Sequence, residues 1–421
     1  MKQFCRLFKC IQQWQKHFFA FSYFTRSRLH GDKEIGTLLI AMGILRRIAW
    51  RQRWPVNTMT DMSQIKPLPL EQDIETKAVL KKLAKAHQAL AELKGVVSGI
   101  PNQSILISTL SLQEAKDSSA IENIITTHDE LYRSDSIARH FVTAAAKEVH
   151  NYATALRNGF EQVKRTGLLT NNDILTIQAS IEENRAGFRK LPGTALKNNL
   201  TGETIYTPPQ HPDEITGLMT NLERFINEDE LCDWDALTKM AIIHHQFESI
   251  HPFYDGNGRT GRIINILYLV QHGLLNSPVL YLSRFINQNK GDYYRLLQAT
   301  RNTGNWEDWL LYMLGGVEQT SRQTTTLIIG IVALMQRHKH TLRDRLPKIY
   351  SQDLINNLFR HPYTKIEFVT DELMVHRNTA TKYLDELVRI GLLSKHRLGK
   401  DNYYLNDALY GLLQNVGTKS E

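Results

Sequence analysis

The segment of residues 251–262, HPFYDGNGRTGR, concentrates side chains that can do chemistry on a phosphorylated substrate. His251 has an imidazole that, when neutral, can take a proton from an incoming hydroxyl near neutral pH. Asp255 offers hard carboxylate oxygens, which are the ligands that Mg²⁺ prefers. The segment therefore combines a candidate general base with a candidate metal ligand.

The glycines and arginines of the same segment are suited to holding phosphate groups. Gly256 and Gly258 allow backbone conformations that a side chain would forbid, so several N–H groups can turn inward around an anion. Arg259 and Arg262 are three residues apart and would share one helix face, and both guanidinium groups can bind phosphate oxygens in pairs. These residues predict a cradle for a nucleoside triphosphate.

Helices are predicted on both sides of this cradle. Apolar residues recur at three- and four-residue steps over 237–250, and an apolar run follows over 263–269. The second run places the glycines at a helix N-terminus, where unpaired N–H groups favour anions. No Gly-Lys-Ser/Thr follows the glycines, so the segment is not a P-loop.

Residues 251–262 fill every specified position of H-x-F-x-(D/E)-G-N-G-R-x-x-R, and on these residues the chain resembles the Fic family. The resemblance implies transfer of AMP from ATP to a protein Ser, Thr or Tyr hydroxyl. His251 would deprotonate the hydroxyl, which attacks the α-phosphate while pyrophosphate leaves. Asp255 would hold Mg²⁺ on the α- and β-phosphates.

The same resemblance assigns the rest of the loop to ATP. Asn257 and the backbone of Gly256 and Gly258 would stabilise charge on the α-phosphate, and the two arginines would bind the β- and γ-phosphates. The Doc branch of the family has Lys at the position of Gly258 and transfers a phosphate, so Gly258 favours AMP transfer. The implied ATP-binding residues are Gly256, Asn257, Gly258, Arg259, Thr260, Gly261 and Arg262.

A second motif lies upstream, where residues 118–123, SSAIEN, resemble the inhibitory pattern (S/T)-x-x-x-E-(G/N) of many Fic proteins. Ser118 and Glu122 are four residues apart and would share a helix face. The resemblance implies that Glu122 pairs with Arg262, which occupies this guanidinium and repels the γ-phosphate. Bound ATP would then be misplaced for attack, as in the class with an N-terminal inhibitory helix.

A β-hairpin flap is predicted between the two motifs. Residues 187–189 and 202–209 resemble the family's hairpin over the active site, and the strand formers 204–206 stand between a glycine and a Pro-Pro stop. Its edge could add a strand from a target protein, or the hairpin could cover the nucleotide, and the sequence does not separate these roles. The predicted flap residues are Glu203, Thr204, Ile205 and Tyr206.

Two pairs of adjacent side chains complete the candidate residues. Tyr293 and Tyr294 resemble the family's aromatic pair beside adenine, but adjacent helical residues point in different directions, so we expect at least one to pack in the core. His244 and His245 diverge by roughly a hundred degrees on a helix, and no Cys or His completes a metal shell. We expect both histidines to pack or to support the site.

The chain has 421 residues, 42% hydrophobic and 22% charged, which is typical of soluble globular proteins with two or three domains. Residues 1–58 carry eleven Lys and Arg against two Asp and Glu, and so account for the whole formal net charge of +8. The near-neutral remainder gives no argument for nucleic-acid binding. Cys5, Cys10 and Cys232 imply no disulfide framework, which favours a cytoplasmic location.

The basic leader 1–58 contains an apolar stretch, 35–45, that is too short to span a bilayer. A basic, aromatic leader could touch anionic membrane. We prefer the interpretation that translation starts at Met59 or Met62 and that the leader is not native, because the family resemblance begins only after Met62. No membrane partner is therefore expected.

The sequence predicts a mainly α fold, with a Fic-type helical core, a β-hairpin flap and a C-terminal winged helix-turn-helix domain. A helix is expected over 72–95, ended by Gly95. The expected segments are the leader 1–58, an N-terminal helical region 59–117, the Fic core 118–316, a connecting helix 317–347 and the winged helix-turn-helix 348–412.

The segment 348–412 is predicted to contain a short helix from Val369, a longer helix from 377 to 387 and a hairpin over 394–405. This order resembles a winged helix, whose second helix would present Arg377, Asn378, Thr379 and Lys382 to DNA. Winged helices also dock proteins, and two acidic residues dilute the basic face. DNA and protein both stay open as partners.

The sequence as a whole predicts a self-inhibited protein adenylyltransferase that uses ATP and Mg²⁺ and modifies target proteins and itself. Removal of AMP from modified proteins, with Glu122 positioning water, is an open alternative. A DNA-binding regulator whose core is a sensor or a relic is another, although the intact His251, Asp255, Asn257 and Arg262 argue against a relic. The target, the donor nucleotide beyond family frequency and the presence of a homo-oligomer are not predicted.

Overall fold

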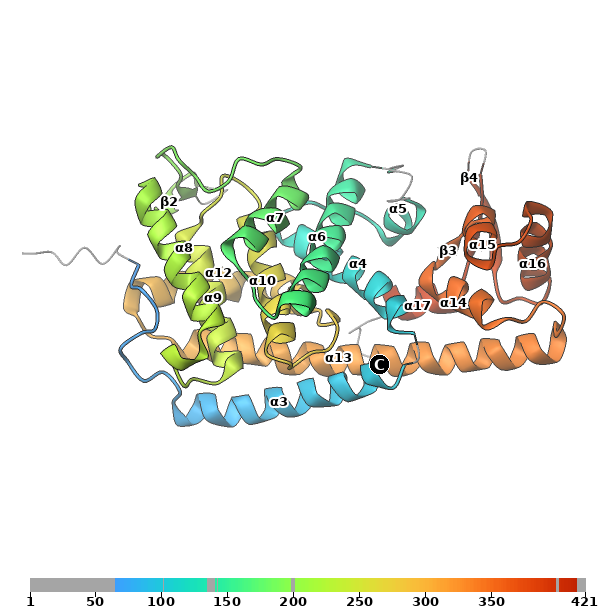
Figure 1. Ribbon diagram of the computed structural model, residues 1–421, viewed down its shortest axis with the longest axis horizontal. Coiled ribbons are helices and arrows are strands. Elements are labelled where there is room, and N and C mark those ends of the chain that lie inside the picture. Colours follow the sequence, from blue (N-terminus) through green and yellow to red (C-terminus); the bar gives the residue numbers. More distant parts are fainter. Residues whose placement is uncertain are drawn as a thin grey trace, which may run out of the picture. The chain divides into compact units, whose positions relative to one another are not determined.

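A computed structural model of the chain describes residues 65–100, 102–134, 141, 143–197, 201–398 and 401–414. The basic leader 1–58, the two candidate start methionines and the hairpin tip at 399–400 lie outside the described residues. Within the described ranges, no helix is long and apolar enough to cross a membrane. The structure is mainly helical, as the sequence predicted (Figure 1).

The larger part of the described chain is a set of helices with one small hairpin (Figure 1). In chain order its elements are α3 (Lys77–Ser98), α4 (Gln103–Ile121), α5 (His128–Arg133), α6 (Ala144–Thr166), α7 (Asn171–Glu182), β1 (Leu196–Lys197), β2 (Thr204–Tyr206), α8 (Pro212–Asn227), the 3₁₀ turn η1 (Asp229–Leu231), α9 (Ala236–Ile250), α10 (Asn257–Gln271), α11 (Leu282–Gln288), α12 (Lys290–Thr303) and α13 (Glu307–Arg345).

Two long helices, α3 and α13, pack along each other at one side of this part (Figure 1). The prediction that Gly95 ends the first helix is wrong, because α3 continues to Ser98 and is capped by Gly99. Burial of Val97 in this extra turn offsets the cost of about 1 kcal/mol for an internal glycine. The predicted boundary between residues 316 and 317 falls inside the unbroken helix α13.

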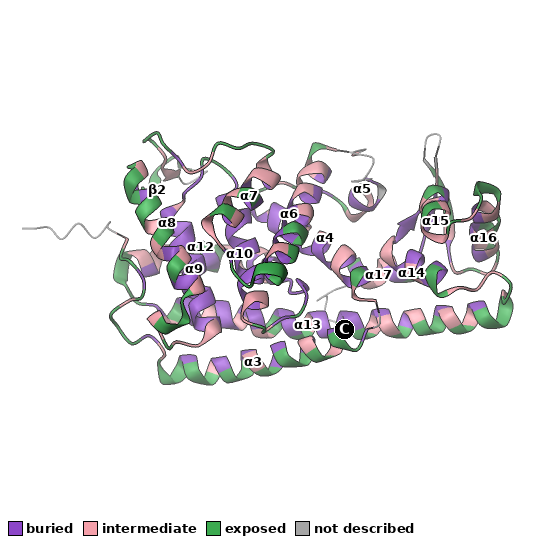
Figure 2. Ribbon diagram, viewed as in Figure 1, coloured by how far each residue is buried: buried purple, intermediate pink, exposed green. Residues whose placement is uncertain are grey.

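The centre of the fold is the pair α9 and α10, which pack against each other and against surrounding helices. Every residue of α9 from Leu237 to Ile250 is buried, and the same holds for most of α10 (Figure 2). The predicted helix over 237–250 is confirmed. Since α9 is enclosed on all sides, its last turn is a fixed point from which the segment 251–262 starts.

The predicted flap strand is confirmed at Thr204–Tyr206. It pairs antiparallel with β1, with Leu196 opposite Tyr206 and Lys197 opposite Thr204. Pro208 and Pro209 follow the strand and have no N–H to extend the pairing, so the hairpin stays short.

The C-terminal elements are α14 (Gln352–Arg360), β3 (Tyr363–Thr364), α15 (Ile366–Leu373), α16 (Arg377–Arg389), β4 (Ser394–Leu398), β5 (Asp401–Leu405) and α17 (Asp407–Gln414). Both predicted helices and the hairpin are present, although α15 begins three residues before Val369. The strands form one antiparallel sheet in the order β3-β5-β4. Contacts of α14 with α4 and of α17 with α13 join these elements to the helical part.

Candidate active site

His251 caps the C-terminal end of α9 in a left-handed conformation, with φ 49° and ψ 58°. Its N–H donates to the carbonyl of Phe247 at 2.9 Å, which closes the last turn of the helix. A side chain in this conformation costs about 1–2 kcal/mol, and the buried helix holds it there. The imidazole is thus fixed at the point where the chain leaves α9.

The imidazole of His251 lies in a largely buried and positive environment. Burial, with the charges of Arg189 and Arg301, lowers the pKa of His251 from its usual 6.5 to about 4. Its Nδ1 is buried without a hydrogen-bond partner among the described residues. The ring is therefore neutral at physiological pH and can accept a proton.

Two arginines bind the carbonyl groups at the end of α9. Arg189 donates from Nε to the carbonyl of His251 at 2.8 Å, and its backbone N–H donates to Pro252 at 2.8 Å. Arg301 donates to the carbonyl of Glu248 at 3.0 Å. The last carbonyls of a helix have no partner inside it, so these guanidinium groups satisfy them and fix the turn.

The loop after His251 is held by the side chain of Asn257. Its amide oxygen accepts from the N–H of Phe253, and its amide nitrogen donates to the carbonyl of the same residue, both at 2.8 Å. The ring of Phe253 is buried against Phe188 at 5.4 Å between centroids. Asn257 therefore shapes the loop, and these two bonds leave the second N–H of its amide group for another acceptor.

The predicted helix N-terminus is present directly after the first glycine. Gly256 is the N-cap of α10, with φ 79°, and a Cβ there would lie 2.7 Å from the Glu182 carboxylate. No side chain caps this end, so the first N–H groups of α10 remain available to an anion. Both the conformation and the close carboxylate require glycine at position 256.

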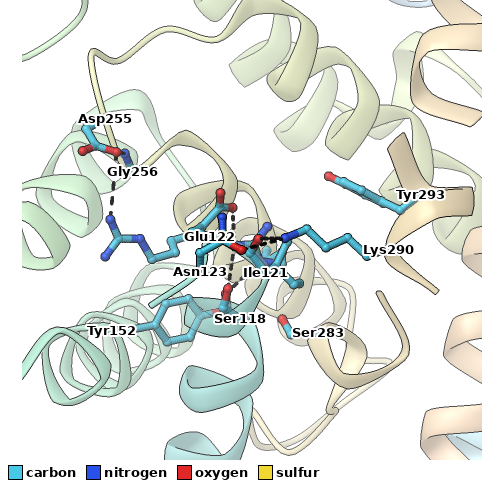
Figure 3. A network of polar contacts seen from close by, with 12 residues as sticks. Ser118, Ile121, Glu122, Asn123, Tyr152, Asp255, Gly256, Ser283, Lys290 and Tyr293 are labelled. Carbon is cyan, nitrogen blue, oxygen red and sulfur yellow. Dashed lines mark hydrogen bonds and ion pairs between the residues drawn. The ribbon is translucent and has the colours of Figure 1, made fainter. Parts of the chain in front are cut away.

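Asp255 stands at the open side of the loop. Its side chain is 80% exposed, and one carboxylate oxygen accepts from the N–H of Gly256 at 2.7 Å (Figure 3). The described residues contain no cluster of three metal-binding side chains. This donor set fits Mg²⁺, which commonly takes one or two carboxylates and completes its shell with phosphate oxygens and water.

Arg259 is almost fully buried and held by two carboxylates from other helices. It pairs with Glu182 at the end of α7, at 2.6 Å, and with Glu148 on α6, at 3.1 Å. Burial and the charges of Asp255 and Glu148 raise the pKa of Glu182, although Arg259 opposes this. Arg259 therefore links three helices beneath the loop, and its Nη2 also lies 4.0 Å from the Asp255 carboxylate at the open side.

Arg262 is paired with the predicted inhibitory motif. Its Nε donates to the hydroxyl of Ser118 at 2.7 Å, and its Nη2 donates to the carbonyl of Ser118 at 3.0 Å and to Glu122 at 2.8 Å (Figure 3). Glu122 itself is the C-cap of α4, one residue beyond the helix. The predicted ion pair of Glu122 with Arg262 is therefore present.

The charge of Glu122 is stabilised where it lies. Burial alone would raise its pKa, but Arg262, Arg259 and Lys290 together lower it. Lys290, the first residue of α12, also donates to the carbonyl of Ile121 at 2.5 Å and so binds the end of α4 (Figure 3). The carboxylate is ionised at neutral pH and stays on Arg262.

The small residues of the loop leave room for this arrangement. A Cβ at Gly258 would overlap the Glu122 carboxylate and lie 2.9 Å from Arg262. A Cβ at Gly261 would lie 3.1 Å from both Phe247 and Glu248 on α9. Thr260 is fully buried, with its hydroxyl unpaired among the described residues, so it is not open to a ligand.

The adjacent pairs on α9 and α12 have separate roles. Tyr293 is a core residue whose hydroxyl lies 2.9 Å from Nε2 of His244, whereas Tyr294 is 47% exposed. His245 bonds the carbonyl of Leu297 at 3.1 Å and packs against Trp306. Both histidines are packing residues, as expected, and only Tyr294 of the tyrosine pair is open to a ligand.

The flap is tied to the end of α9 through one of its predicted residues. The hydroxyl of Tyr206 donates to the carbonyl of Ser249 at 2.9 Å, and the Arg301 guanidinium lies 4.1 Å from the ring centroid. Ile205 is half exposed, and Glu203 and Thr204 are exposed. At the start of the flap, the hydroxyl of Tyr254 accepts from two backbone N–H groups, at 190 and 191, each at 3.0 Å.

Family models match most of the helical part and the C-terminal elements. The Fic/DOC family N-terminal model matches residues 80–161, the Fic/DOC family model matches residues 168–269, and the model of the protein adenylyltransferase SoFic-like C-terminal domain matches residues 334–409. The chain belongs to the Fic family.

Relatives within the Fic family match parts of the chain. It is 25% identical over 191 residues to protein adenylyltransferase Fic of Aedes aegypti, covering 45% of this chain and 36% of the relative. A probable protein adenylyltransferase of Aquifex aeolicus is 30% identical over 184 residues, covering 42% of this chain and 53% of the relative. The chain thus spans about half or less of these relatives' length.

A solved structure supports the Fic fold itself. A Fic family protein from Desulfovibrio desulfuricans G20 superposes with a TM-score of 0.51 at 19% sequence identity, covering 81% of this chain and 98% of the other. At this identity the likeness concerns the fold.

Several residues of this Fic site carried no signal in the sequence. Glu148, Glu182 and Lys290 come from distant helices and fit no short motif. Arg301 also lies outside any motif, and Arg189 stood out only as part of the flap resemblance. A buried arginine needs hydrogen-bond acceptors, so the motif predicts that such acceptors must exist but not which residues supply them.

Proposed function

We propose that this chain transfers AMP from ATP to a Ser, Thr or Tyr hydroxyl of a protein, including its own, and releases pyrophosphate. The observation that carries the proposal is the neutral imidazole of His251, fixed at the end of α9 beside the uncapped N-terminus of α10. A base and an anion site that adjoin in this way suit attack of a hydroxyl on a phosphate. The names of the Fic relatives agree with this chemistry.

In the proposed reaction His251 takes the proton of the target hydroxyl as its oxygen bonds to the α-phosphorus. The bond from the α-phosphorus to the α,β-bridging oxygen breaks, and pyrophosphate leaves with the electron pair. The neutral state of His251, with its pKa of about 4, makes the base available at physiological pH. Tyr206 and Arg301 hold the flap beside the same helix end, where a target segment could lie.

The phosphates would lie against the start of α10. The free N–H groups after Gly256 stabilise charge on the α-phosphate, and Arg262 would bind the terminal phosphate once it leaves Glu122. Asp255 would hold Mg²⁺, which supplies charge neutralisation on the triphosphate when bound. Arg259 supports this face from beneath through its two carboxylates.

The ion pair of Glu122 with Arg262 is proposed to inhibit the transfer. The carboxylate takes up the Arg262 guanidinium, adds negative charge beside the phosphates and overlaps the space next to Gly258. ATP that binds in this state has its terminal phosphate displaced, so its α-phosphate is not in line with the hydroxyl. Removal of the carboxylate should release the arginine.

Label transfer from ATP tests the proposal. The wild type, Glu122→Gly and the double variant Glu122→Gly/His251→Ala are incubated with Mg²⁺ and with ATP labelled at the α- or γ-position. We expect protein-bound label from the α-position only, increased by the first change and lost with the second. Label from the γ-position would mean a kinase, and label that survives loss of His251 would remove the proposed base.

Removal of AMP from modified proteins is a second candidate that one observation favours. Only one carboxylate oxygen of Glu122 is bound to Arg262, and the side chain is 34% exposed, so the other oxygen can orient a water. An AMP-modified protein from the first experiment serves as the substrate. Release of AMP by the wild type but not by Glu122→Gly would support this activity.

A further inference from the structure

The C-terminal turn of α12 carries an arginine that contacts both the flap and the helix of the candidate base. Arg301 donates from Nε to the hydroxyl of Ser249 at 2.9 Å and from Nη2 to the carbonyl of Glu248 at 3.0 Å. Its guanidinium lies over the ring of Tyr206, 4.1 Å from the centroid. No sequence motif singles out this residue.

The contacts of Arg301 close a ring of interactions between three elements. Arg301 binds α9 at residues 248 and 249, Tyr206 of the flap lies on Arg301, and the Tyr206 hydroxyl returns to the carbonyl of Ser249 at 2.9 Å. His251 follows two residues later on the same turn. A shift of the flap is therefore transmitted to the turn that holds the imidazole.

The chemistry of arginine suits this place better than that of lysine. The guanidinium is planar, so it can stack on the tyrosine ring while its edge donates two hydrogen bonds in fixed directions. A lysine ammonium at the same point would keep the charge but could not do both. Arg295, on the same helix, offers a matched contrast because it is 63% exposed and, among the described residues, its ion pair is with the neighbouring Asp292.

We propose that Arg301 is a positioning residue that locks Tyr206 of the flap onto the end of α9 and so sets the distance between a bound target segment and His251. The lock is mechanical and acts on attack of the hydroxyl, and not on ATP, because none of its contacts touches the α10 phosphate face. The expected change in kcat rests on the proposed transfer of AMP, whereas the contact between the flap and α9 does not.

The lock is tested by kinetics in the Glu122→Gly background, which lacks the inhibitory carboxylate. Arg301→Met, Arg301→Lys and the control Arg295→Met are placed in Glu122→Gly, and self-modification from α-labelled ATP is followed. We expect kcat to fall about ten- to a hundred-fold for Arg301→Met, with KM for ATP within about two-fold, since small misplacement of reacting groups has this effect. Arg301→Lys should recover only a minor part of the kcat that Arg301→Met loses, and Arg295→Met should leave kcat and KM unchanged.

A second readout does not depend on any catalytic activity. A spin label is attached at Glu203→Cys on the flap, with Cys5, Cys10 and Cys232 changed to Ser, and its mobility is compared among the same variants. Arg301→Met and Tyr206→Leu should each increase the mobility of the spin label. The double variant should increase it little further, because both substitutions break the same contact between Arg301 and Tyr206. Arg295→Met should match the parent.

The outcomes separate this inference from the proposed function. Increased flap mobility with a fall in kcat at constant KM for ATP supports the lock. Increased mobility in a protein that transfers no label supports the lock and removes the adenylyltransferase proposal. Unchanged mobility in Arg301→Met, or a kcat equal to that of Arg295→Met in an active protein, overturns the lock. A fall in kcat that tracks a lower melting temperature in every variant also overturns it, because loss of folded protein lowers kcat without changing KM.

Discussion

The ion pairs of the loop 251–262 and those of the C-terminal elements use the same residue types in opposite ways. Arg259 and Arg262 have side chains that are only 4% and 2% exposed, and their carboxylate partners come from α4, α6 and α7. In the C-terminal elements, Arg377 pairs with Glu367 and Lys395 with Asp385, all at least 38% exposed. The first set connects distant helices, whereas these two C-terminal pairs join residues close in the sequence at the surface; the pair of Arg360 with Glu372 is less exposed, at 30% and 25%.

This difference indicates in which region the loss of a charged partner should affect the free energy of unfolding. Breaking a buried pair leaves a charge without solvent, which costs about 3–5 kcal/mol, whereas a surface pair contributes about 0–1 kcal/mol. The arginines of the loop are also the groups that a nucleotide would compete for. The basic residues of 348–412 have no such isolation, and Arg377, Arg389 and Lys395 are already neutralised by neighbouring carboxylates.

The largest effect on AMP transfer is expected at His251, because this residue of the loop contributes proton transfer and not an ion pair. His251→Ala in the Glu122→Gly background should lower AMP transfer by about 10²–10⁴-fold or more while ATP affinity stays within about two-fold. Rates from α-labelled ATP and equilibrium binding measure the two quantities. If His251→Ala still transferred AMP at the rate of its parent, proton transfer would not depend on this loop.

The buried pairs themselves should be sensitive to loss of one partner. Glu182→Gln removes a carboxylate from Arg259, and we expect the free energy of unfolding to fall by about 2–4 kcal/mol. The surface counterpart Glu367→Gln should change it by less than about 1 kcal/mol. Urea unfolding of the two variants measures both values, and equal losses would abolish the contrast between the regions.

The pair of Arg262 with Glu122 should act on the rate of AMP transfer as well as on stability. Glu122→Gly is expected to raise AMP transfer about ten-fold or more, since it frees a guanidinium that bidentate phosphate binding needs. Lys290→Met, which loosens the end of α4, should raise it less. In the Glu122→Gly background Lys290→Met should add nothing, and an additive increase would show that Lys290 acts by another route.

The pH dependence sharpens the role of the buried histidine. The folded pKa of His251, about 4, is below its unfolded value of 6.5, so protonation is disfavoured in the fold. Its contribution to stability is therefore present above about pH 6.5 and is lost as the pH falls toward 4. Transfer by Glu122→Gly should show no acid limb from His251 above about pH 5. A limb near pH 6.5 would mean a solvated imidazole.

The smallest effect is expected for duplex DNA. Because Arg377, Arg389 and Lys395 are each paired with a carboxylate, we expect the full chain to bind DNA no more tightly than nonspecific proteins, with Kd about 10⁻⁴–10⁻⁶ M at physiological salt. Fluorescence anisotropy across a salt series measures this. Tight binding with a steep salt dependence would assign 348–412 to nucleic acid after all.

Local pattern predicted much of this structure, because its information lies within one turn or loop. The helices around 251–262 and the strand Thr204–Tyr206 follow from spacing, whereas the Glu122–Arg262 pair was expected only from the resemblance to the inhibitory pattern of Fic proteins. Gly95 was misassigned because a glycine ends a helix only if tertiary burial does not continue beyond it. The supporting partners Glu148, Glu182 and Lys290 depend on how separate helices meet, which no local pattern records.

The space beside Gly258 has a consequence for the history of such loops. The Glu122 carboxylate occupies the place where a side chain at position 258 would begin, so a side chain there would displace the carboxylate from its present position on Arg262. A lineage that acquires a larger residue there, such as the lysine of the Doc branch, must first give up this glutamate or move it. A larger residue at position 258 would thus fill the loop and weaken the ion pair of Glu122 with Arg262 in a single change.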